Sequence, residues 1–468
     1  MSPLTLTPQA AARQGKTLAV FDFGKTNSKM LVYGQDGTVL ATARSAPRWV
    51  MDGATRILDE EALHSWVRDS LAAAATELDC DRVMISAHAC TFALIADDQL
   101  LLPILDYEYA APGEIEQRFR ALQPPFTETG SPDLPAGLNY GLHIYWRAEH
   151  WPEAFAKAQA ILPYPQFWNW RLAGTVQAEI SYVGCHSHLW SPQRDDYSSL
   201  VDHLGWREKM PPLKRAGAVV GTLALTLPDG GERVLQVHNG VHDSNASLYF
   251  YRSFGYTSFS LISTGTWVIA FNTDATLDQM DGARDMLANV SVDRQPVVTA
   301  RFMGGREFDL ISGNARVKIG LGEIEAAIAA GQMALPSFAP GGPYPESVGR
   351  LVGPEPASEA ERAAVGSLYL ACMTATVLDM LGSDNTVIID GGLALNPVYA
   401  TLIASLRPNQ TVLVNADAEG TAAGAASLAF ETFGVSPFKD PCTRVEPQVI
   451  PGLDAYAAAW REAAKAGR

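Results

Sequence analysis

The sequence predicts an α/β protein with two domains and a duplicated core. A chain of 468 residues is too long for one ordinary hydrophobic core, so two domains are the expected count. A short apolar run followed by a polar, glycine-containing turn and a second strand-like run occurs once near the N-terminus and once past the middle. Helix and strand patterns alternate between and after these units, as they do in α/β folds. The repeated unit therefore predicts two similar halves.

The first repeated unit begins with the apolar run 17–21, TLAVF, which is typical of a buried strand. The turn Asp22-Phe23-Gly24-Lys25-Thr26-Asn27 follows it. Further on, Gln35-Asp36-Gly37 separates two apolar stretches and predicts a β-hairpin. Residues 59–78 predict an amphipathic helix with acidic residues at its N-terminal end, and residues 82–86 predict the next strand.

Two segments of the N-terminal half lack this regularity. Residues 124–135, PPFTETGSPDLP, are rich in turn formers, and residues 162–172 are crowded with aromatic side chains. We interpret both segments as insertions that shape a pocket. The aromatic cluster also has the plainer interpretation of core packing.

The second repeated unit begins with the apolar run 259–262, FSLI, and continues through the turn Ser263-Thr264-Gly265-Thr266-Trp267 into another strand-like stretch. The regular pattern downstream predicts helices over 357–381, 397–406 and 419–430 and strands over 386–390 and 411–414. Because no low-complexity linker separates the halves, we expect an N-terminal domain of residues 1–247 and a C-terminal domain of residues 248–468.

Composition narrows the class of protein. The 35 Lys and Arg residues against 51 Asp and Glu residues give a net charge of −16, which argues against a nucleic-acid surface or an anionic membrane as partner. The five cysteines are scattered without CxxC spacing, so the sequence indicates neither a disulfide framework nor a structural zinc site. We find no leader pattern and no uninterrupted apolar run of membrane-spanning length. A cytoplasmic protein without processing is the expectation.

Both turns have the chemistry of a phosphate-binding loop. Backbone amides in such a turn can surround an anionic oxygen, glycine permits close approach, and hydroxyl side chains add donors. Two familiar loops are excluded. Gly24-Lys25-Thr26 lacks the glycine of a Walker loop, because Ala19 stands where it is needed, and Asp22-Phe23-Gly24 has no kinase catalytic-loop sequence before it. Two such turns with Asp243 between them in the sequence suggest a phosphotransferase whose active site lies between its two lobes.

With these residues in view, the chain resembles the FGGY carbohydrate kinases over almost its full length. The motifs that carry the resemblance occur in the family's order: Asp22-Phe23-Gly24-Lys25-Thr26, Glu128-Thr129-Gly130 with Trp146, Gly240-Val241-His242-Asp243 with Ala246, Ser263-Thr264-Gly265-Thr266-Trp267, Asp390-Gly391-Gly392 with Asn396, and Glu419-Gly420-Thr421-Ala422 with Gly424 and Ala425. The resemblance implies the two-domain actin-like ATPase (ribonuclease H-like) fold. It also implies an ATP-dependent sugar kinase that uses Mg²⁺.

The resemblance assigns expected roles to individual residues. Asp243 is the expected general base for the sugar hydroxyl that attacks the γ-phosphorus of ATP, although an Asp before Ser-Asn-Ala also suits a helix cap. Asp22 is expected to hold Mg²⁺ through water. The residues expected at the nucleotide are Gly24, Lys25, Thr26, Asn27, Gly265 and Thr266 at the phosphates and Gly391, Gly392 and Asn396 at the adenosine. A solvated turn lysine is the alternative for Lys25.

The expected sugar site combines His88, Asp106 or Glu108, and His242 beside Asp243. Relatives often carry an aromatic residue, one further residue and then an acid in the segment that contains Asp106 and Glu108. The spacing here is altered, so both acids compete for the role of accepting paired hydroxyl hydrogen bonds. His242 with Asp243 and the Thr-Gly-Thr-Trp loop resemble the branch that phosphorylates deoxy-ketohexoses such as L-rhamnulose and L-fuculose. Kinases of another ketose or polyol, such as xylulose, ribulose or glycerol, are the alternative.

Two other functional classes compete with a sugar kinase. His186 with His188, and His238 before His242, have ligand-like spacing, which would suit a metal-dependent hydrolase. A sugar-sensing protein that keeps the fold without phosphorylation is the second competitor, and the presence of Asp22 and Asp243 argues against it. We expect a small-molecule sugar and ATP as partners, no nucleic acid and no membrane, with a homodimer as the assembly to test.

Overall fold

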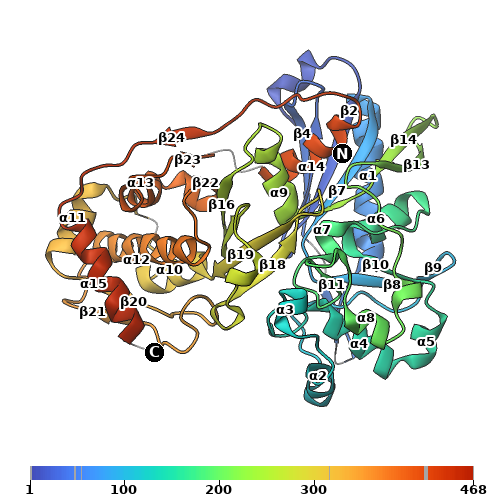
Figure 1. Cartoon of the computed structure of the whole chain (residues 1–468). Coiled ribbons are helices and arrows are strands. Elements are labelled where there is room, and N and C mark those ends of the chain that lie inside the picture. The colour runs from blue at the N-terminus through green and yellow to red at the C-terminus, as the bar shows by residue number, and fades with distance from the viewer. Residues whose placement is uncertain (1–2, 47–48, 54, 316, 416–419, 467–468) are drawn as a thin grey trace. The chain divides into compact units, whose positions relative to one another are not determined.

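The structure is a computed structural model that describes residues 3–46, 49–53, 55–315, 317–415 and 420–466 (Figure 1). It divides into two compact units. Unit 1 comprises Met1–Gly255, Ala288–Pro296 and Gly420–Lys439, and unit 2 comprises Tyr256–Leu287, Val297–Glu419 and Asp440–Arg468. The boundary expected after residue 247 falls inside helix α9 (Asp243–Arg252), and unit 1 takes up later segments that a single cut in the sequence does not provide.

The main sheet of unit 1 carries the first repeated unit. Its order is β1-β4-β3-β2-β7-β14-β13, with β15 also pairing with β7. The strands are β1 (Thr5–Leu6), β4 (Val39–Ser45), β3 (Ser28–Tyr33), β2 (Thr17–Phe23), β7 (Cys80–Ala87), β14 (Glu232–His238), β13 (Val219–Thr226) and β15 (Val241–His242). The pairs β2–β3 and β3–β4 are antiparallel, whereas β7 is parallel to β2 and to β15. The predicted hairpin at residues 35–37 is the β3–β4 connection.

The main sheet of unit 2 repeats this arrangement. Its order is β18-β19-β17-β16-β22-β23-β24. The strands are β18 (Met286–Val290), β19 (Pro296–Phe302), β17 (Val268–Asn272), β16 (Phe259–Thr264), β22 (Thr386–Gly391), β23 (Val412–Val414) and β24 (Thr443–Val445). Again two antiparallel pairs, β16–β17 and β17–β19, stand beside a strand, β22, that is parallel to the first strand of the unit. The predicted duplication of the core is therefore present in both sheets.

Helices and small hairpins complete each unit. In unit 1 they are α1 (Glu60–Leu78), α2 (Gly113–Arg120), α3 (Phe126–Thr129), α4 (Tyr140–His150), α5 (Pro152–Lys157), α6 (Tyr164–Ala173), α7 (Ile180–Val183), α8 (Ser199–His203), α9, α14 (Gly420–Glu431), β5 (Trp49–Asp52), β6 (Thr55–Leu58), β8 (Phe92–Ala96), β9 (Gln99–Leu100), β10 (Ala160–Pro163), β11 (Trp190–Ser191) and β12 (Asp196–Tyr197). In unit 2 they are α10 (Gly304–Ser312), α11 (Leu321–Ala329), α12 (Glu359–Met380), α13 (Pro397–Leu406), α15 (Leu453–Ala466), β20 (Met333–Leu335) and β21 (Arg350–Val352). The predicted helices over 59–78, 357–381, 397–406 and 419–430 correspond to α1, α12, α13 and α14, and residue 419 lies outside the described residues.

Helix α12 is the core helix of unit 2. It packs against α10, α11 and α13 and is long and apolar enough to cross a membrane by length and composition (Figure 1). However, 89% of its most apolar window is buried inside the protein. A helix that is apolar on all sides and buried in this way has the pattern of a core helix.

The two irregular segments of the N-terminal half have structural tasks. The aromatic segment 162–172 forms β10 and α6, and Phe167 and Trp168 are completely buried. It is core packing, because a helix that is buried on all its faces needs apolar side chains on most of them.

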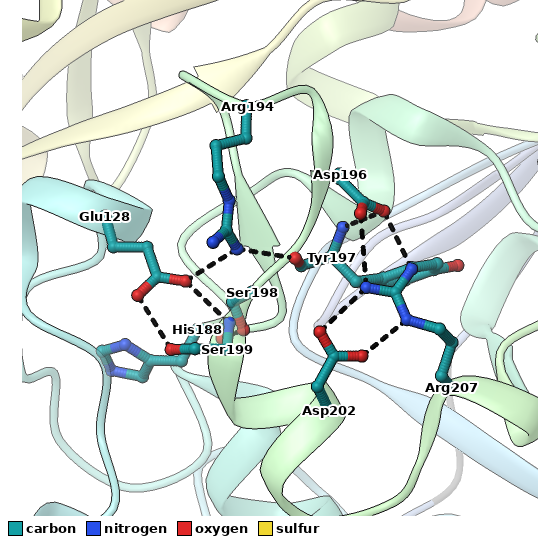
Figure 2. Close-up of polar contacts among 9 residues, drawn as sticks. All are labelled: Glu128, His188, Arg194, Asp196, Tyr197, Ser198, Ser199, Asp202 and Arg207. Carbon is teal, nitrogen blue, oxygen red and sulfur yellow. Dashed lines mark hydrogen bonds and ion pairs between the residues drawn. The ribbon is translucent and has the colours of Figure 1, made fainter.

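In the turn-rich segment, Glu128 accepts hydrogen bonds from N and Oγ of Ser199 at 2.7 and 2.8 Å and pairs with Arg194 at 2.9 Å (Figure 2). That carboxylate ties α3 to the start of α8.

Candidate active site

Three parallel strands of unit 1 end side by side and carry the predicted acidic residues. In the β2–β7 register Asp22 lies opposite Ser86, and in the β15–β7 register Val241 lies opposite the same Ser86. Asp22 on β2 and Asp243 after β15 therefore flank the carboxyl end of β7, and His88 directly follows that end. The carboxyl ends of parallel strands are where ligands bind in open α/β sheets.

The first turn leaves polar groups accessible. The amide of Gly24 donates to the carbonyl of Asn27 at 2.9 Å, which closes the turn between β2 and β3. The side chains of Thr26 and Asn27 are exposed, with Asn27 Nδ2 donating to Thr26 Oγ1 at 3.3 Å. Asp22 is mostly buried, and its Oδ2 lies 3.4 Å from Nζ of Lys29. The turn thus combines hydroxyl, amide and carboxylate groups at one edge of the sheet.

Lys25 turns toward the predicted sugar-reading segment. Its ammonium pairs with Asp106, lies 3.6 Å from Glu108 Oε2, and stands 4.1 Å from the ring centre of Trp49 and 4.8 Å from that of Tyr107. Aromatic faces at these distances stabilise a cation. In this structure Lys25 therefore belongs to the Asp106 cluster, although it lies in a turn expected to face phosphate.

Asp106 and Glu108 have different environments. Asp106 has a completely buried side chain, whose Oδ1 accepts from Lys25 and from the backbone amide of Glu108 at 3.0 Å and whose Oδ2 lies 2.5 Å from Nε of Arg56. The side chain of Glu108 is 54% exposed and pairs with Arg56 at 3.3 Å. The inner acid is thus committed to protein partners on both oxygens, whereas the outer acid faces solvent.

His88 links this cluster to the end of β7. Its Nδ1 donates to the carbonyl of Ala89 at 2.8 Å, because a carbonyl can only accept, and this leaves the lone pair on Nε2. Its ring packs 5.2 Å from Tyr107 and 5.0 Å from Tyr164. Burial lowers the pKa of His88 to about 4, and the nearby charge of Lys25 lowers it further. The imidazole is therefore neutral at physiological pH.

Asp243 is the first residue of α9 and has a partly buried carboxyl group with a raised pKa. Its side chain is 29% exposed. Burial raises its pKa from 3.8 to about 6, which the hydrogen bonds from Ser244 oppose. Ser244 N and Oγ donate to Oδ1 at 2.6 and 3.2 Å, and Nε2 of His242 lies 3.2 Å from the same oxygen. Burial also raises the pKa of Tyr107, and the charge of Asp243 adds to that rise, so the sugar-reading segment lies within electrostatic reach of Asp243.

Helix α6 holds the strand that leads to Asp243. Gln166 Nε2 donates to the side chain of Asn239 at 3.1 Å and to the carbonyl of Gly240 at 3.0 Å. Asn169 accepts from the amide of Gly240 at 2.9 Å and donates to the carbonyl of His238 at 2.8 Å. Gln166 is completely buried, so it fixes the backbone before the acid instead of framing a ligand.

Unit 2 builds its turn from backbone and hydroxyl groups. Thr264 Oγ1 donates to the carbonyl of Asp390 at 2.6 Å and accepts from the amide of Leu393 at 2.9 Å. The amide of Gly265 donates to the carbonyl of Trp267 at 2.8 Å. Gly391 has φ +86°, and a Cβ there would lie 2.2 Å from the carbonyl oxygen of Thr264. The phosphate-type turn and the Gly391 turn are thus in direct contact.

The remaining predicted residues of unit 2 lie around these turns. Thr266 is exposed beside Gly265. Gly392 begins the short helical turn Gly392–Leu395, and Asn396 follows it. The side chain of Asn396 accepts from the amide of Val398 at 3.1 Å and so caps α13. Its amide nitrogen is the group left for a ligand.

Sequence reasoning missed Trp49, Arg56 and Tyr107 as members of the Asp106 cluster. Arg56 lies in the small hairpin β5–β6, which carries no motif, and only the three-dimensional pairing brings it to Asp106. Tyr107 stands between the two candidate acids in the sequence, so its proximity to them could be predicted. Its contact with Lys25 could not. A search for aromatic residues adjacent to candidate acids would have found only Tyr107.

Two of the histidines that suggested a hydrolase, His186 and His238, bond to backbone carbonyls. His238 Nδ1 donates to the carbonyl of Gly217 at 2.6 Å, and His186 Nδ1 donates to the carbonyl of Leu138 at 2.8 Å. Both bonds are assigned in this direction because a carbonyl can only accept. Within the described ranges, no group of three or more His, Cys, Asp or Glu side chains is arranged to hold a metal ion.

Comparison with known proteins identifies the family. Residues 256–437 match the family described as carbohydrate kinase FGGY, C-terminal domain. A solved carbohydrate kinase from Novosphingobium aromaticivorans is 33% identical over 97% of this chain and 99% of its own, with a TM-score of 0.87. A xylulose kinase from Lactobacillus acidophilus (14% identity, TM-score 0.76, 97% of each chain) shares the fold. So does glycerol kinase from Plasmodium falciparum (12% identity, TM-score 0.77, 97% of this chain and 99% of its own).

A search of curated proteins gave no match. The identity and coverage of the Novosphingobium kinase, together with the family match, decide the family. The duplicated sheets agree with the two-domain actin-like ATPase fold. The chain belongs to the FGGY carbohydrate kinases and is an ATP-dependent sugar kinase.

Proposed function

We propose that the protein transfers the γ-phosphate of ATP to a hydroxyl of a ketose, with Asp243 as the general base. The observation that carries this proposal is the state of Asp243. It is a mostly buried carboxyl group with a pKa raised to about 6 by burial, and its hydrogen bonds all fall on Oδ1. Among the residues that the structure describes, none donates to Oδ2. A base with a pKa near neutral and a free oxygen is suited to take a hydroxyl proton.

The nucleotide is assigned to both phosphate-type turns. Gly24, Thr26 and Asn27 of unit 1 and Gly265 and Thr266 of unit 2 supply amides and hydroxyls for the phosphates. Gly391, Gly392 and Asn396 supply backbone and an amide group for the adenosine. Lys25 remains a candidate phosphate ligand, and that role requires its ammonium to be shared with, or to leave, Asp106.

Asp22 fits a magnesium ion held through water. A mostly buried carboxylate at a strand end offers hard oxygen ligands, and Mg²⁺ commonly binds one or two carboxylates while keeping several waters and the substrate phosphates as its other ligands. When bound, the ion would neutralise charge on the phosphates. Asp22 would orient its waters, and the nearby ammonium of Lys29 would limit the net negative charge at that edge.

The sugar is assigned to the cluster around Asp106. Because Asp106 has protein partners on both oxygens, we assign the contact with the sugar hydroxyls to Glu108, with Asp106 holding Lys25 and Arg56 in place. His88 offers the Nε2 lone pair to a hydroxyl. A deoxy-ketohexose such as L-rhamnulose or L-fuculose is the favoured substrate class. The fold is shared with xylulose, gluconate and glycerol kinases, which keeps the corresponding substrates as alternatives.

The cellular setting follows from this function. A sugar kinase that consumes ATP is expected in the cytoplasm, with the sugar and ATP as its partners and with no nucleic acid or membrane. A homodimer is the assembly to test by light scattering. The net charge of −16 is compatible with a protein that binds its anionic nucleotide through local amides and cations.

The test uses coupled ADP release over L-rhamnulose, L-fuculose, L- and D-xylulose, L- and D-ribulose, D-gluconate and glycerol. We expect one member of the panel to stimulate ADP release and Asp243→Asn to reduce its turnover by a factor of about 10² to 10⁴, with nucleotide affinity nearly unchanged. Asp81→Asn is the matched control, because Asp81 also lies in unit 1 with a side chain that is 25% exposed. Wild-type turnover in Asp243→Asn would refute the assignment.

A further inference from the structure

The surroundings of His242 fix which of its ring nitrogens carries the proton. Nδ1 of His242 lies 3.0 Å from Nδ2 of Asn245, one turn along α9. The same Nδ2 donates to the carbonyl of Ser181 at 3.4 Å. Because a carbonyl can only accept, the amide nitrogen and not its oxygen must face Ser181, and the nitrogen's other proton then points to His242. Nδ1 of His242 is therefore the acceptor.

The opposite ring nitrogen then becomes a donor toward Asp243. A neutral imidazole with its lone pair on Nδ1 carries its proton on Nε2. Burial lowers the pKa of His242 to about 3, so the ring is neutral. Nε2 lies 3.2 Å from Asp243 Oδ1, and both His242 and Asn245 are buried. The contacts from Ser181 through Asn245 to His242 thus place the protonated Nε2 3.2 Å from Oδ1.

We infer that His242 is a positioning residue that, in the tautomer set by Asn245, holds Oδ1 of Asp243 and presents Oδ2 alone to the acceptor hydroxyl. This inference rests on the proposed function, because it assumes that Asp243 is the base. It replaces the expectation that His242 reads the sugar. Asn245 Oδ1 is buried without a hydrogen-bond partner among the described residues, and turning the amide over would set that oxygen against the carbonyl of Ser181.

Other ionisable groups lie around Asp243, and the pH measurement has to separate them. The charge of Asp243 raises the pKa values of Tyr107 and Cys185, a protonated His242 would lower that of His88, and the ring of Tyr182 lies 6.1 Å from that of His242. Burial raises the pKa values of Tyr107, Cys185 and Tyr182 further from neutrality and lowers that of His88 to about 4.

Glu179 is the group that titrates in the same range as Asp243. Burial raises its pKa to about 7, and it bonds to N and Oγ of Ser181. A Glu179→Gln background removes that titration while keeping an oxygen that accepts from Ser181. We expect the acid limb of kcat/KM to stay near pH 6 in this background.

The kinetic test compares His242→Leu with His242→Gln, using the best acceptor of the ketose and polyol panel. An N–H donated to a carboxylate favours its charged form, so its loss in His242→Leu raises the pKa of Asp243. We expect kcat to fall about 10- to 100-fold, the acid limb of kcat/KM to move up by about one pH unit, and the sugar KM to change less than about threefold. His242→Gln, which can still donate an N–H, should recover most of kcat and the wild-type limb.

A role for His242 as a sugar ligand would give a different result. In that case His242→Leu raises the sugar KM tenfold or more and leaves kcat and the acid limb in place, which overturns the inference. Wild-type kinetics in His242→Leu overturn it as well. If Asp243→Asn keeps its turnover, the proposed function fails and this inference fails with it. If Asp243→Asn is inactive while His242→Leu behaves as wild type, only the inference fails.

A measurement on the unmodified protein covers the case in which a variant does not fold. The ¹⁵N shifts of the histidine side chains distinguish protonated from unprotonated ring nitrogens, and the signal missing from His242→Gln assigns His242. We expect Nε2 protonated and Nδ1 unprotonated between pH 5 and pH 8. In Asn245→Asp, the new carboxylate can only accept a hydrogen bond, so we expect the tautomer to reverse and Nδ1–H to donate to it. Protonated Nδ1 in the wild-type protein would refute the inference without reference to activity.

Discussion

The two phosphate-type turns share a backbone plan but differ in what stabilises them. Each follows the first strand of an antiparallel hairpin that lies beside a parallel strand, and in each the first glycine amide donates to a carbonyl within the turn. In unit 1 the turn carries Lys25, which pairs with a buried acid and two aromatic rings. In unit 2 the turn contains no charged residue and rests on the Thr264 hydroxyl and on Gly391.

This difference shows how the two copies of a duplicated unit can take different roles. Backbone amides and glycine give a surface that any phosphate can approach, which suits the unit 2 turn. Charged side chains give a turn that also organises a neighbouring site, which suits the unit 1 turn next to Asp106 and Asp243. Substitutions in unit 2 should therefore act through steric fit, and those in unit 1 through charge.

Gly391→Ala should produce the largest loss of stability. It tests the expectation that substitutions in unit 2 act through steric fit. The new Cβ would meet a backbone oxygen 2.2 Å away at φ +86°, so neither strain nor clash can be relieved by a side-chain movement. We expect the free energy of unfolding to fall by about 3 kcal/mol or more, measured by urea denaturation. Gly392→Ala is the matched control, since its Cβ would lie 4.0 Å from its nearest neighbour. Equal effects of the two substitutions would contradict the steric account.

Lys25→Met tests the expectation that substitutions in the unit 1 turn act through charge. It leaves the completely buried Asp106 with Arg56 as its remaining cation. Removing one partner of a buried ion pair costs about 3 kcal/mol, and we expect a loss of that order in the free energy of unfolding. The double variant with Asp106→Asn should be less destabilised than the sum of the single variants. Additive losses would mean that the pair is not coupled.

The pH dependence of stability tests the role of charge in unit 1 through the carboxyl group of Asp243. The native carboxyl of Asp243 has a pKa of about 6, above its ordinary value of 3.8, so the native state holds its proton where the unfolded state has lost it. The carboxyl therefore destabilises the native protein progressively from about pH 4 to pH 6, by at most about 3 kcal/mol and by less because the side chain is 29% exposed.

Asp243→Asn removes that penalty. We expect the variant to be about 2 kcal/mol more stable than wild type at pH 7.5, with the gap closing toward pH 4. Thermal unfolding across this pH range measures the gap. A gap that does not depend on pH would show that the native pKa of Asp243 is not raised.

Thr264→Val should give the smallest effect. The substitution keeps the shape but leaves the amide of Leu393 without its acceptor and the carbonyl of Asp390 without its donor. We expect a loss of about 1 kcal/mol in the free energy of unfolding. Thr266→Val is the control, because the exposed Thr266 should tolerate the change within about 0.5 kcal/mol. A larger loss for Thr266→Val than for Thr264→Val would show that the Thr264 hydroxyl is not the group that stabilises this turn.

The sequence predicted the repeated strand–turn–strand units and the major helices because these depend on short-range patterns. Alternation, glycine turns and the capping position of Asp59 before α1 are all local signals. The partner of Lys25 could not be predicted, because a turn fixes the backbone but not the direction of a long flexible side chain. Likewise, the aromatic run at 162–172 gave no sign of whether it lined a pocket or filled the core, since both uses need the same residues.

The division into units was also beyond local patterns. Residues 420–439 follow a strand of unit 2 in the chain but pack into unit 1, and only tertiary contacts reveal this. The motif around Asp243 predicted an acid at the start of a helix, and α9 begins there. It did not predict Asn245 as the partner of His242, because that contact depends on the orientation of an amide.

Helix α14 closes a core of unit 1 whose other buried residues all precede residue 293 in the chain. Its apolar residues, from Ala422 to Phe430, pack with Leu18, Val20, Met84 and Ala246, and a Cβ on Gly424 would lie 1.9 Å from the carbonyl oxygen of Ala246. On the ribosome, the helix that begins with Asp243 therefore lacks its packing partner until residues 420–431 have been synthesised. Folding of unit 1 to completion thus depends on a segment that is made after most of unit 2, and a fragment that stops at residue 255 would expose this apolar surface.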